Sequence, residues 1–312
     1  MKKKILILLL FIAVIVACLI PFSKPVAVKI NASYFNCYQQ LFTLQNWKNW
    51  QPGISSSFKK DSSLYQVNDV SQGFKLVTPG EYFLVKKFGT DNLLVKRVWE
   101  NNDFNYALTI IPNTLGLTTT IIVTIKTNAL GYLIPALENR ELNKTSIFDF
   151  KHYMEDVKRY YGFNLKTGFA TEKKFMVKSK IIATGQMYTE AAESQKQLNN
   201  YILLKHLKQV APMITQYIPK SGDSLQMLVG IPVNQPIPAG NGFLYMYMPP
   251  TRVLIADFKG KYRDRKKVYT AMAKYVQDKF ITTKNAPFEV FTNKLPATAD
   301  DVVEFRLTYP IL

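Results

Sequence analysis

The sequence predicts an α+β protein in which two domains follow an apolar N-terminal segment. Its 312 residues fit two domains of ordinary size. A run of short β-type segments separated by turn residues fills much of the first half, and an internal repeat fills the second half. With 47% hydrophobic and 20% charged residues, the composition excludes a disordered, collagen-like or coiled-coil protein.

The N-terminal segment, residues 1–23, is predicted to be a membrane anchor. Lys2 to Lys4 precede an unbroken apolar run from Ile5 to Phe22. As a helix this run would be about 27 Å long, just enough to cross the hydrocarbon core of a bilayer. The basic cluster is expected to stay in the cytoplasm, which places both domains on the extracytoplasmic side of the cell membrane.

A lipoprotein signal is the alternative interpretation of this segment. The residues Ile15-Val16-Ala17-Cys18 resemble a bacterial lipobox, in which Cys18 would be acylated. The residues after Cys18 continue the apolar run instead of becoming polar, and this favours an uncleaved, single-pass anchor. Both interpretations tether the same domains to the outer side of a membrane.

The first domain is predicted to begin with a strand and a helix and then to become rich in strands. The strand covers Val26 to Asn31, the helix covers Tyr34 to Leu44, and a closing helix covers Ile147 to Tyr161. The strands between them are expected at Ser63 to Val70, Gly73 to Val77, Tyr82 to Phe88, Leu93 to Glu100, Phe104 to Ile111 and Leu117 to Lys126.

This order of elements, with N-W-K-N-W-Q-P at 46–52, resembles the START-like superfamily called SRPBCC over residues 26–165. The resemblance implies a helix-grip fold, in which a curved sheet wraps a long helix around an apolar cavity that often holds a hydrophobic ligand. We interpret Trp47 and Trp50 as packing residues at the base of the helices.

The second half contains two similar β-α-β-β units. Lys180 to Gly185 parallels Val253 to Phe258, and a helix follows each strand. Both units end on similar strands, residues 226–233 and 304–311. Two such units related by pseudo-twofold symmetry are expected to enclose a groove.

The segment from Pro249 to Leu312 resembles a GyrI-like small-molecule-binding domain, the effector-binding module also fused to AraC- and MerR-type regulators. The resemblance rests on R-V-L-I-A-D-F-K-G at 252–260, A-P-F-E-V-F-T-N at 286–293 and E-F-R-L-T-Y-P-I at 304–311. The repeat extends it to residues 170–312. It implies a central pocket in which an acidic residue meets cationic ligands and, in some members, hydrolysis by such a carboxylate with an aromatic hydroxyl.

Aligned with this family, the acidic position of the closing strand falls on Arg306, with Glu304 two residues earlier on the same face. A guanidinium cannot replace the carboxylate and disfavours cationic ligands, although it could bind a carboxylate or phosphate, or pair with Glu304. The family's hydrolase role is therefore not expected here. We interpret Glu289, which matches a glutamate of the family, as structural.

Tyr245 and Tyr247 complete the set of candidate ligand-binding residues with Glu304 and Arg306. They share a strand face with Phe243, and tyrosines on a concave sheet suit ligand stacking, although such a stripe is more often core.

The sequence indicates no cofactor, metal or nucleic acid. His152, His206 and Cys37 have no partners at the spacing of metal ligands, and Gly-rich phosphate loops and nucleophile elbows are missing. The formal net charge of +18 includes Lys2 to Lys4, and the remaining lysines and arginines are interleaved with acids. We expect the charge to suit an anionic membrane surface.

The sequence therefore predicts a membrane-tethered, non-enzymatic protein that captures a small hydrophobic or amphipathic molecule. A hydrolase of small xenobiotics that uses the GyrI-like pocket is the alternative. A signalling or scaffold protein that has lost ligand binding is a third interpretation. A transcription factor is the least favoured, because the usual DNA-binding module is replaced by the anchored START-like domain.

Overall fold

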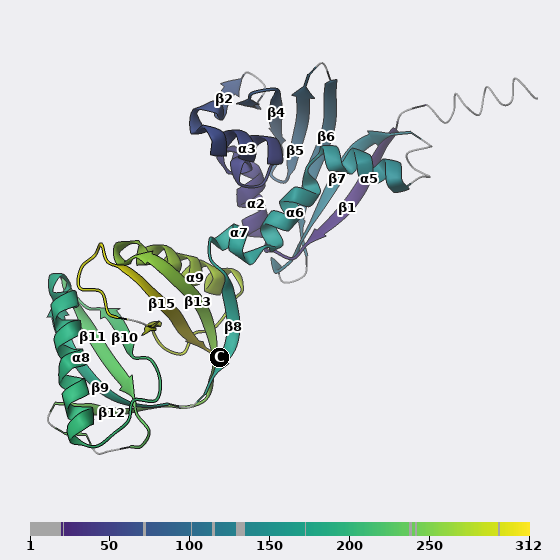
Figure 1. Ribbon diagram of the computed structural model, residues 1–312. Helices are drawn as coiled ribbons and strands as arrows, with labels where there is room; N and C mark the ends of the chain where they lie inside the picture. The colour runs from purple at the N-terminus through teal and green to yellow at the C-terminus, as the bar shows by residue number, and fades with distance from the viewer. Residues whose placement is uncertain are drawn as a thin grey trace, which may run out of the picture. The chain divides into compact units, whose positions relative to one another are not determined.

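The computed structural model describes residues 20–312 apart from 21, 71–72, 101, 114–115, 129–134, 172, 237–238, 241 and 293. It divides into two compact units, Met1–Asp156 and Val157–Leu312 (Figure 1). Within the described residues, no helix is long and apolar enough to span a membrane. Almost all of the predicted anchor, including Cys18, lies outside the described residues. Phe22 and Ser23, which we assigned to the anchor, are the first two residues of strand β1.

The first unit is built on one antiparallel sheet of seven strands in the order β1-β7-β6-β5-β4-β3-β2. Buried and exposed residues alternate along its strands, as they do from Phe104 to Ile110, so one face of the sheet forms the core. The strands are β1 (Phe22–Ile30), β2 (Gln66–Val70), β3 (Gly73–Thr78), β4 (Glu81–Phe88), β5 (Asn92–Trp99), β6 (Asn102–Pro112) and β7 (Thr119–Thr127).

Short helices cover the core face of this sheet (Figure 1). They are α2 (Tyr34–Phe42), the 3-10 helix η1 (Leu44–Asn49), α3 (Pro52–Lys60), the 3-10 helix η2 (Ser62–Leu64), α5 (Pro135–Lys144) and α6 (Ile147–Glu155). Trp47 and Trp50 are buried between helices and sheet, where their rings lie 5.7 Å from Phe83 and 5.0 Å from Phe150, respectively. Both indole N–H groups donate to α2 carbonyl oxygens. The packing role predicted for the two tryptophans is therefore confirmed.

The prediction of a continuous helix from Ile147 to Tyr161 is wrong. Helix α6 ends at Glu155, Asp156 is extended at φ −81° and ψ 103°, and α7 (Val157–Tyr161) begins after it. Ser146, in the left-handed region at φ 56°, separates α5 from α6. The apolar residues before and after Asp156 keep the spacing of a single helix in the sequence. Such spacing does not reveal one residue whose backbone leaves the helical dihedral angles.

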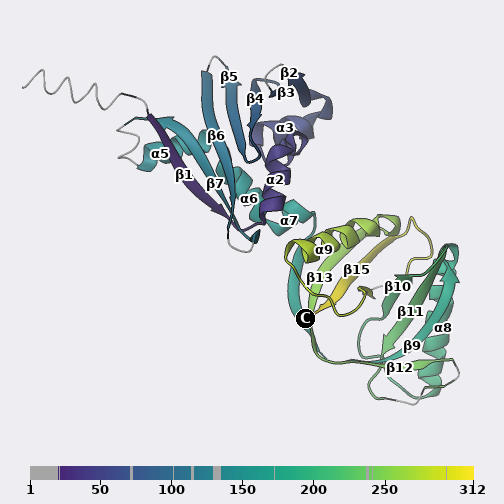
Figure 2. The same cartoon turned by 180° about the vertical axis from the view of Figure 1, so that it is seen from behind.

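The second unit is an eight-stranded antiparallel sheet in the order β12-β9-β11-β10-β14-β15-β13-β8. Helix α8 (Met187–Leu204) lies against β9 and β11, and α9 (Lys266–Asp278) lies against β13 (Figures 1 and 2). A 3-10 turn precedes each helix, η4 (Thr184–Gln186) and η5 (Tyr262–Arg265). The strands are β8 (Leu165–Ala170), β9 (Lys173–Ala183), β10 (Ile214–Pro219), β11 (Ser224–Pro232), β12 (Leu244–Met248), β13 (Thr251–Lys261), β14 (Phe288–Phe291) and β15 (Val302–Ile311).

Strand register shows that this unit consists of two equivalent halves, β9-α8-β10-β11 and β13-α9-β14-β15. Val177 pairs with Gly230 in the first half as Ile255 pairs with Thr308 in the second. The halves meet where β10 pairs with β14. The predicted pseudo-twofold β-α-β-β repeat is confirmed, and the arrangement is consistent with a GyrI-like fold.

The predicted register of the first strands of the repeat is wrong by five residues. Lys180 pairs with Met227, and Phe258 pairs with Phe305, so that Lys180 is equivalent to Phe258 and not to Val253. A shared Ile-Ala pair gave the two strands a local likeness, whereas hydrogen bonding to the closing strands sets their actual alignment. The predicted alignment of the closing strands themselves, 226–233 with 304–311, agrees with the pairing.

Candidate functional site

The most distinctive polar cluster of the second unit surrounds Glu289, at the centre of the eight-stranded sheet. Its neighbours on β14, Phe288 and Val290, face the side of the sheet without helices, so Glu289 points toward the helices. The Glu289 carboxylate is 0% exposed although the flanking residues are apolar. An ionised group at such a position requires partners, because burial removes its hydration.

Three hydroxyl groups donate hydrogen bonds to this carboxylate. The Tyr262 hydroxyl lies 2.7 Å from Oε2, the Tyr269 hydroxyl 2.9 Å from Oε1, and Thr215 Oγ1 3.2 Å from Oε2. They come from η5, α9 and β10, respectively, so the cluster ties one helix and its preceding turn to both central strands. Together with a guanidinium, this set of donors is the one that suits an ionised carboxylate.

Arg265 supplies the positive charge. Its Nη1 lies 3.2 Å from Glu289 Oε1 and also donates to the Tyr262 hydroxyl. The guanidinium carbon lies 4.3 Å from the centroid of the Tyr262 ring and 5.0 Å from that of the Tyr217 ring. A cation is thus held between aromatic faces and a carboxylate, an arrangement that stabilises positive charge away from water.

Burial is the largest cause of the pKa shifts in this cluster, and it sets their direction for Glu289 and the tyrosines but not for Arg265. It raises the pKa of the Glu289 carboxyl, against the opposing effects of Arg265 and the hydroxyl donors. Burial alone would lower the pKa of Arg265, but Glu289 and the tyrosines outweigh it, and the pKa rises. Burial raises the pKa of Tyr217 to about 12 and also raises the pKa of Tyr262 and Tyr269. The phenols therefore remain protonated donors at neutral pH.

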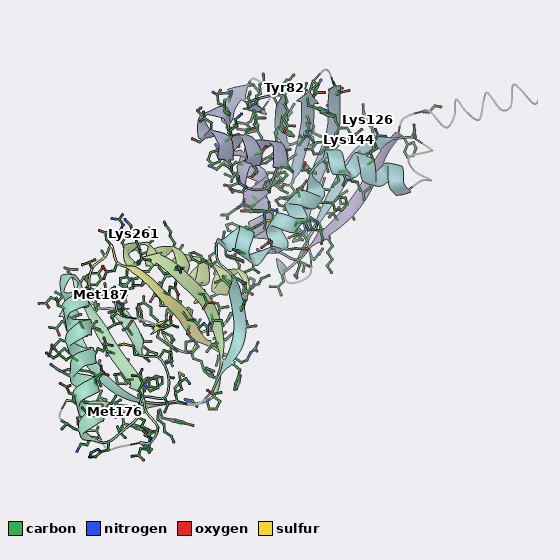
Figure 3. The ribbon with its side chains drawn as sticks, in the orientation of Figure 1. Tyr82, Lys126, Lys144, Met176, Met187 and Lys261 are labelled. Atoms are coloured by element: carbon green, nitrogen blue, oxygen red, sulfur yellow. The ribbon has the colours of Figure 1, made fainter. Side chains whose placement is uncertain are left out.

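The ion pair of Glu289 and Arg265 and the two tyrosines that donate to it come from one half of the repeat only. Counting on from the equivalent strands β9 and β13, the equivalents of Tyr262, Arg265 and Tyr269 are Thr184, Met187 and Ala191. Met187 is the first residue of α8, and Lys261 is the last residue of β13; both are labelled in Figure 3. Across the pseudo-twofold axis, Arg265 Nη2 lies 3.1 Å from the Met187 sulfur.

The four residues predicted to bind ligand are not brought together around this cluster. Arg306 Nε binds Asp257 Oδ1 at 2.8 Å, and Glu304 pairs with Lys259, both across the β13–β15 pair on the side without helices. Arg306 is therefore not tied to Glu304. Tyr245 packs against the core under the helices, and Tyr247 lies at the rim of a hollow.

Two adjoining hollows of about 320 Å³ and 270 Å³ mark the side of the sheet without helices. Ile214, Met248 and Phe288 line both. Tyr247 lines the larger hollow and Arg306 the smaller one, so these two predicted residues do border concave, mainly apolar surface. Ligand binding by the four predicted residues stays a prediction.

Sequence reasoning missed Arg265, Tyr262 and Tyr269 and took Glu289 as purely structural. The signal that pointed to the cluster was Glu289 itself, a carboxylate within the short apolar run Phe288 to Phe291. A charged residue at an inward position of a strand demands a buried partner. Within the described residues, no group of three or more His, Cys, Asp and Glu side chains could hold a metal ion.

No protein-family model and no curated protein sequence matches this chain. Among solved structures it is similar to EcmrR in a complex with DNA, with 16% identity, coverage of 57% of this chain and 72% of EcmrR, and a TM-score of 0.42. SAV2435 bound to tetraphenylphosphonium gives 11% identity, 48% and 94% coverage, and a TM-score of 0.32. A hydrolase from Listeria innocua has 8% identity, with coverage of 51% of this chain and 98% of the hydrolase, and a TM-score of 0.35. Because these TM-scores are below 0.5, we draw nothing about ligand or activity from them.

Proposed function

We propose that this chain is a small-molecule-binding protein whose second unit captures an amphipathic ligand with a positively charged group at Glu289. The observation that carries the proposal is the asymmetry of the repeat. A buried ion pair contributes little stability compared with well-packed apolar residues. One half of the repeat folds with Thr184, Met187 and Ala191 where the other half has a charged, aromatic cluster. Such a cluster is better explained by recognition of a ligand than by folding.

In this proposal, the Arg265 guanidinium occupies the position beside Glu289 that the positively charged group of the ligand would take. Its side chain is 19% exposed, whereas Glu289 is fully buried, so the guanidinium lies on the solvent side of the carboxylate. A ligand cation that displaced it would meet the same carboxylate and the rings of Tyr217 and Tyr262. The GyrI-like resemblance also implies a central carboxylate that meets cationic ligands, and Glu289 takes that role in place of Arg306.

Thermal unfolding of the full chain with tetraphenylphosphonium, a lipophilic cation, tests this proposal. We expect a rise in the unfolding temperature for the native chain and a larger rise for Arg265→Met, because the ligand then restores a lost partner to Glu289. Glu289→Gln should abolish the rise, and neutral triphenylphosphine oxide should produce none. Arg306→Met is the matched control on the opposite face. Equal shifts in all variants, or loss of the shift only in Arg306→Met, would contradict the proposal.

Membrane tethering through residues 1–23 is part of the same proposal and is supported by Lys2 to Lys4 and the apolar run that follows. In bacterial cells, we expect the chain in the membrane fraction after carbonate extraction, with or without Cys18→Ser. Loss from that fraction in Cys18→Ser, together with loss of palmitate labelling, would support the lipoprotein alternative instead.

Hydrolysis is the second candidate function, because the Tyr262 hydroxyl lies 2.7 Å from the Glu289 carboxylate. This is a carboxylate and an aromatic hydroxyl of the kind that the GyrI-like resemblance implies for its hydrolases. The raised pKa of Tyr262 opposes proton transfer at neutral pH. Turnover of electrophilic small molecules that disappears in both Glu289→Gln and Tyr262→Phe would establish this function.

A further inference from the structure

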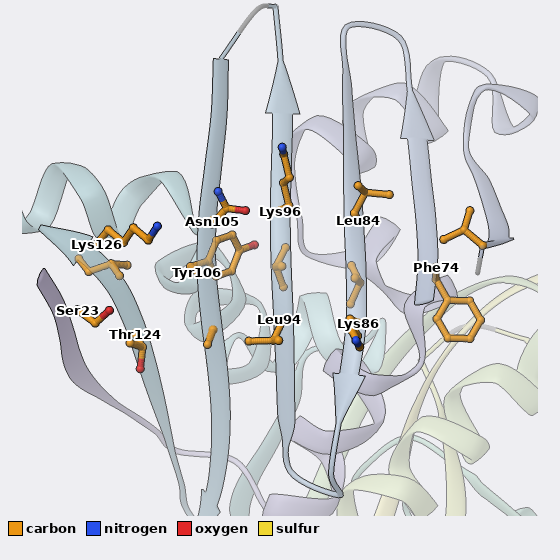
Figure 4. A pocket seen from close by; sticks show the side chains of 15 residues that line it. Ser23, Phe74, Leu84, Lys86, Leu94, Lys96, Asn105, Tyr106, Thr124 and Lys126 are labelled. Atoms are coloured by element: carbon orange, nitrogen blue, oxygen red, sulfur yellow. The ribbon is translucent and has the colours of Figure 1, made fainter. Parts of the chain in front are cut away.

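The seven-stranded sheet of the first unit has a hollow on the face opposite its helices. Its volume is about 650 Å³, within the range of about 300–1,000 Å³ that is usual for ligand pockets. Residues of all seven strands line it, and Figure 4 shows Phe74 of β3 beside the side chains of β1 and of β4 to β7. Trp47, Trp50, Phe83 and Phe150 fill the other face, so the hollow is separate from the cavity expected of a helix-grip fold.

Strand register explains why the surface is hollow at this place. Cross-strand pairing aligns Lys86 of β4 with Leu94 of β5, then Ala107 of β6, then Thr124 of β7. Side chains at paired positions share a face. Short side chains at Ala107 and Thr124 therefore form a depression beside the longer Leu94, and Leu84 extends the apolar floor from the neighbouring row.

The charged residues that line this floor are all lysines. The fifteen lining residues include Lys86, Lys96 and Lys126 and contain no carboxylate. Lys96 binds Asp103 at 2.7 Å, whereas Lys86 and Lys126 are in no ion pair in the described part of the chain. Figure 4 shows Lys126 and Lys86 on either side of the depression, with Leu94 between them. The hollow thus combines an apolar floor with ammonium groups at its rim, and Asp103, the carboxylate that binds Lys96, is also close enough for Lys126 to lower its pKa.

We propose that this hollow binds one molecule of an anionic amphiphile, whose alkyl chain lies over Leu84, Leu94 and Ala107 and whose carboxylate or phosphate group is held by Lys86 or Lys126. An alkyl chain gains by leaving water, and an ammonium group attracts an anionic headgroup more strongly beside a surface of low dielectric. Ser23 of β1 also lines the hollow and ends the predicted anchor segment, which suits a ligand taken from lipid.

Photo-labelling of the full chain in a non-ionic detergent tests the proposal with a diazirine-bearing palmitic acid, followed by peptide mapping. We expect labelled peptides from β4 to β7 and at least a tenfold weaker half-saturation for the methyl ester of the probe. Ala107→Phe, which fills the floor, and the double variant Lys86→Gln/Lys126→Gln should each weaken labelling at least tenfold. Lys59→Gln/Lys60→Gln, on the exposed end of α3, removes the same charge elsewhere and should leave labelling unchanged.

Competitors separate the sources of the anionic group. Dodecyl phosphate and lauric acid should both compete with the probe, whereas inorganic phosphate alone should not. Labelling confined to segments that do not line the hollow, equal labelling by the methyl ester, or competition by inorganic phosphate would overturn the proposal. So would an equal loss in the Lys59/Lys60 control, or no effect of Ala107→Phe in a variant that still unfolds at the native temperature. Because the hollow lies in the first unit, none of these results bears on the site at Glu289.

Discussion

Thr215 and Glu289 pair with each other across the centre of the eight-stranded sheet, and they occupy equivalent positions in the two halves of the repeat. The Thr215 hydroxyl donates to the carboxylate of its own equivalent at 3.2 Å. A neutral residue therefore satisfies this position in one half and an ionised residue satisfies it in the other. Met187, the equivalent of Arg265, also contacts the charged pair, because its sulfur lies 3.1 Å from Arg265 Nη2.

Removal of one member of the buried ion pair should lower the free energy of unfolding more than removal of both members. Glu289→Thr or Arg265→Met alone leaves an unpaired buried group, and we expect each to lower the free energy of unfolding by about 3–5 kcal/mol. The double variant copies Thr215 and Met187 from the other half and should cost less than either single change. Urea unfolding of the four proteins gives the coupling energy of the pair.

A matched pair on the opposite face provides the control for this cycle. Arg306 and Asp257 are both more than half exposed, so Arg306→Met and Asp257→Thr should each change the free energy of unfolding by less than about 1 kcal/mol. Additive effects of Arg265→Met and Glu289→Thr would show that the buried pair is not coupled.

The contributions of the Tyr262 and Tyr269 hydroxyl groups to stability should also be measurable one at a time. Each donates to a buried carboxylate, so Tyr262→Phe and Tyr269→Phe should each lower the free energy of unfolding by about 1.5–3 kcal/mol. Tyr188→Phe is the control, because its ring contacts Tyr262 but its hydroxyl makes no hydrogen bond within the described residues. An equal effect of all three changes would show that the loss of a hydroxyl lowers stability by the same amount whether or not it donates to Glu289.

The sequence alone located the repeat but not the chemistry at its centre. Alternation and the closing strands were enough to predict two β-α-β-β units, because each half repeats its own pattern of buried residues. The cluster escaped prediction because Glu289 and Arg265 are distant in sequence and meet only when β14 lies under the turn before α9. Family alignment directed attention to Arg306, whose side chain faces the other side of the sheet.

In the first unit, the order of strands was predictable and the shape of the helical layer was not. Turn residues divide the strands clearly, whereas Ser146 and Asp156 interrupt helices with no Gly or Pro to indicate it. The START-like resemblance stays a prediction. The hollow over Leu94 and Ala107 depends on cross-strand register, which a sequence pattern does not supply.

At position 146, glycine should give a more stable protein than alanine. Its φ of 56° lies in the left-handed region, which costs an L-residue with a Cβ about 1–2 kcal/mol, and its side chain makes no capping hydrogen bond. We expect Ser146→Gly to be more stable than Ser146→Ala by about 1 kcal/mol in urea unfolding. The reverse order would show that this residue is helical and that α5 and α6 are continuous.

Cys37 should be protected from thiol reagents and should make stability depend on alkaline pH. Its thiol is fully buried, and burial raises its pKa to about 12. In a Cys18→Ser chain at pH 8, we expect Ellman's reagent to react with Cys37 only as fast as the first unit opens, and urea should release the full reaction.

The direction of the pH effect follows from the raised pKa of Cys37 in the folded state. An unfolded cysteine has a pKa of about 8.5, so the folded state holds this proton more tightly, and the contribution to stability is complete below that pH. As the pH rises from about 8.5 toward 12, the unfolded chain ionises first and stability falls by up to about 1.4 kcal/mol per pH unit. Because Lys and Tyr residues also titrate in this range, the effect is the difference between the Cys18→Ser chain and the same chain with Cys37→Ala. Parallel profiles for the two proteins between pH 8 and 10.5 would mean that the Cys37 thiol ionises in the folded state as readily as in the unfolded chain.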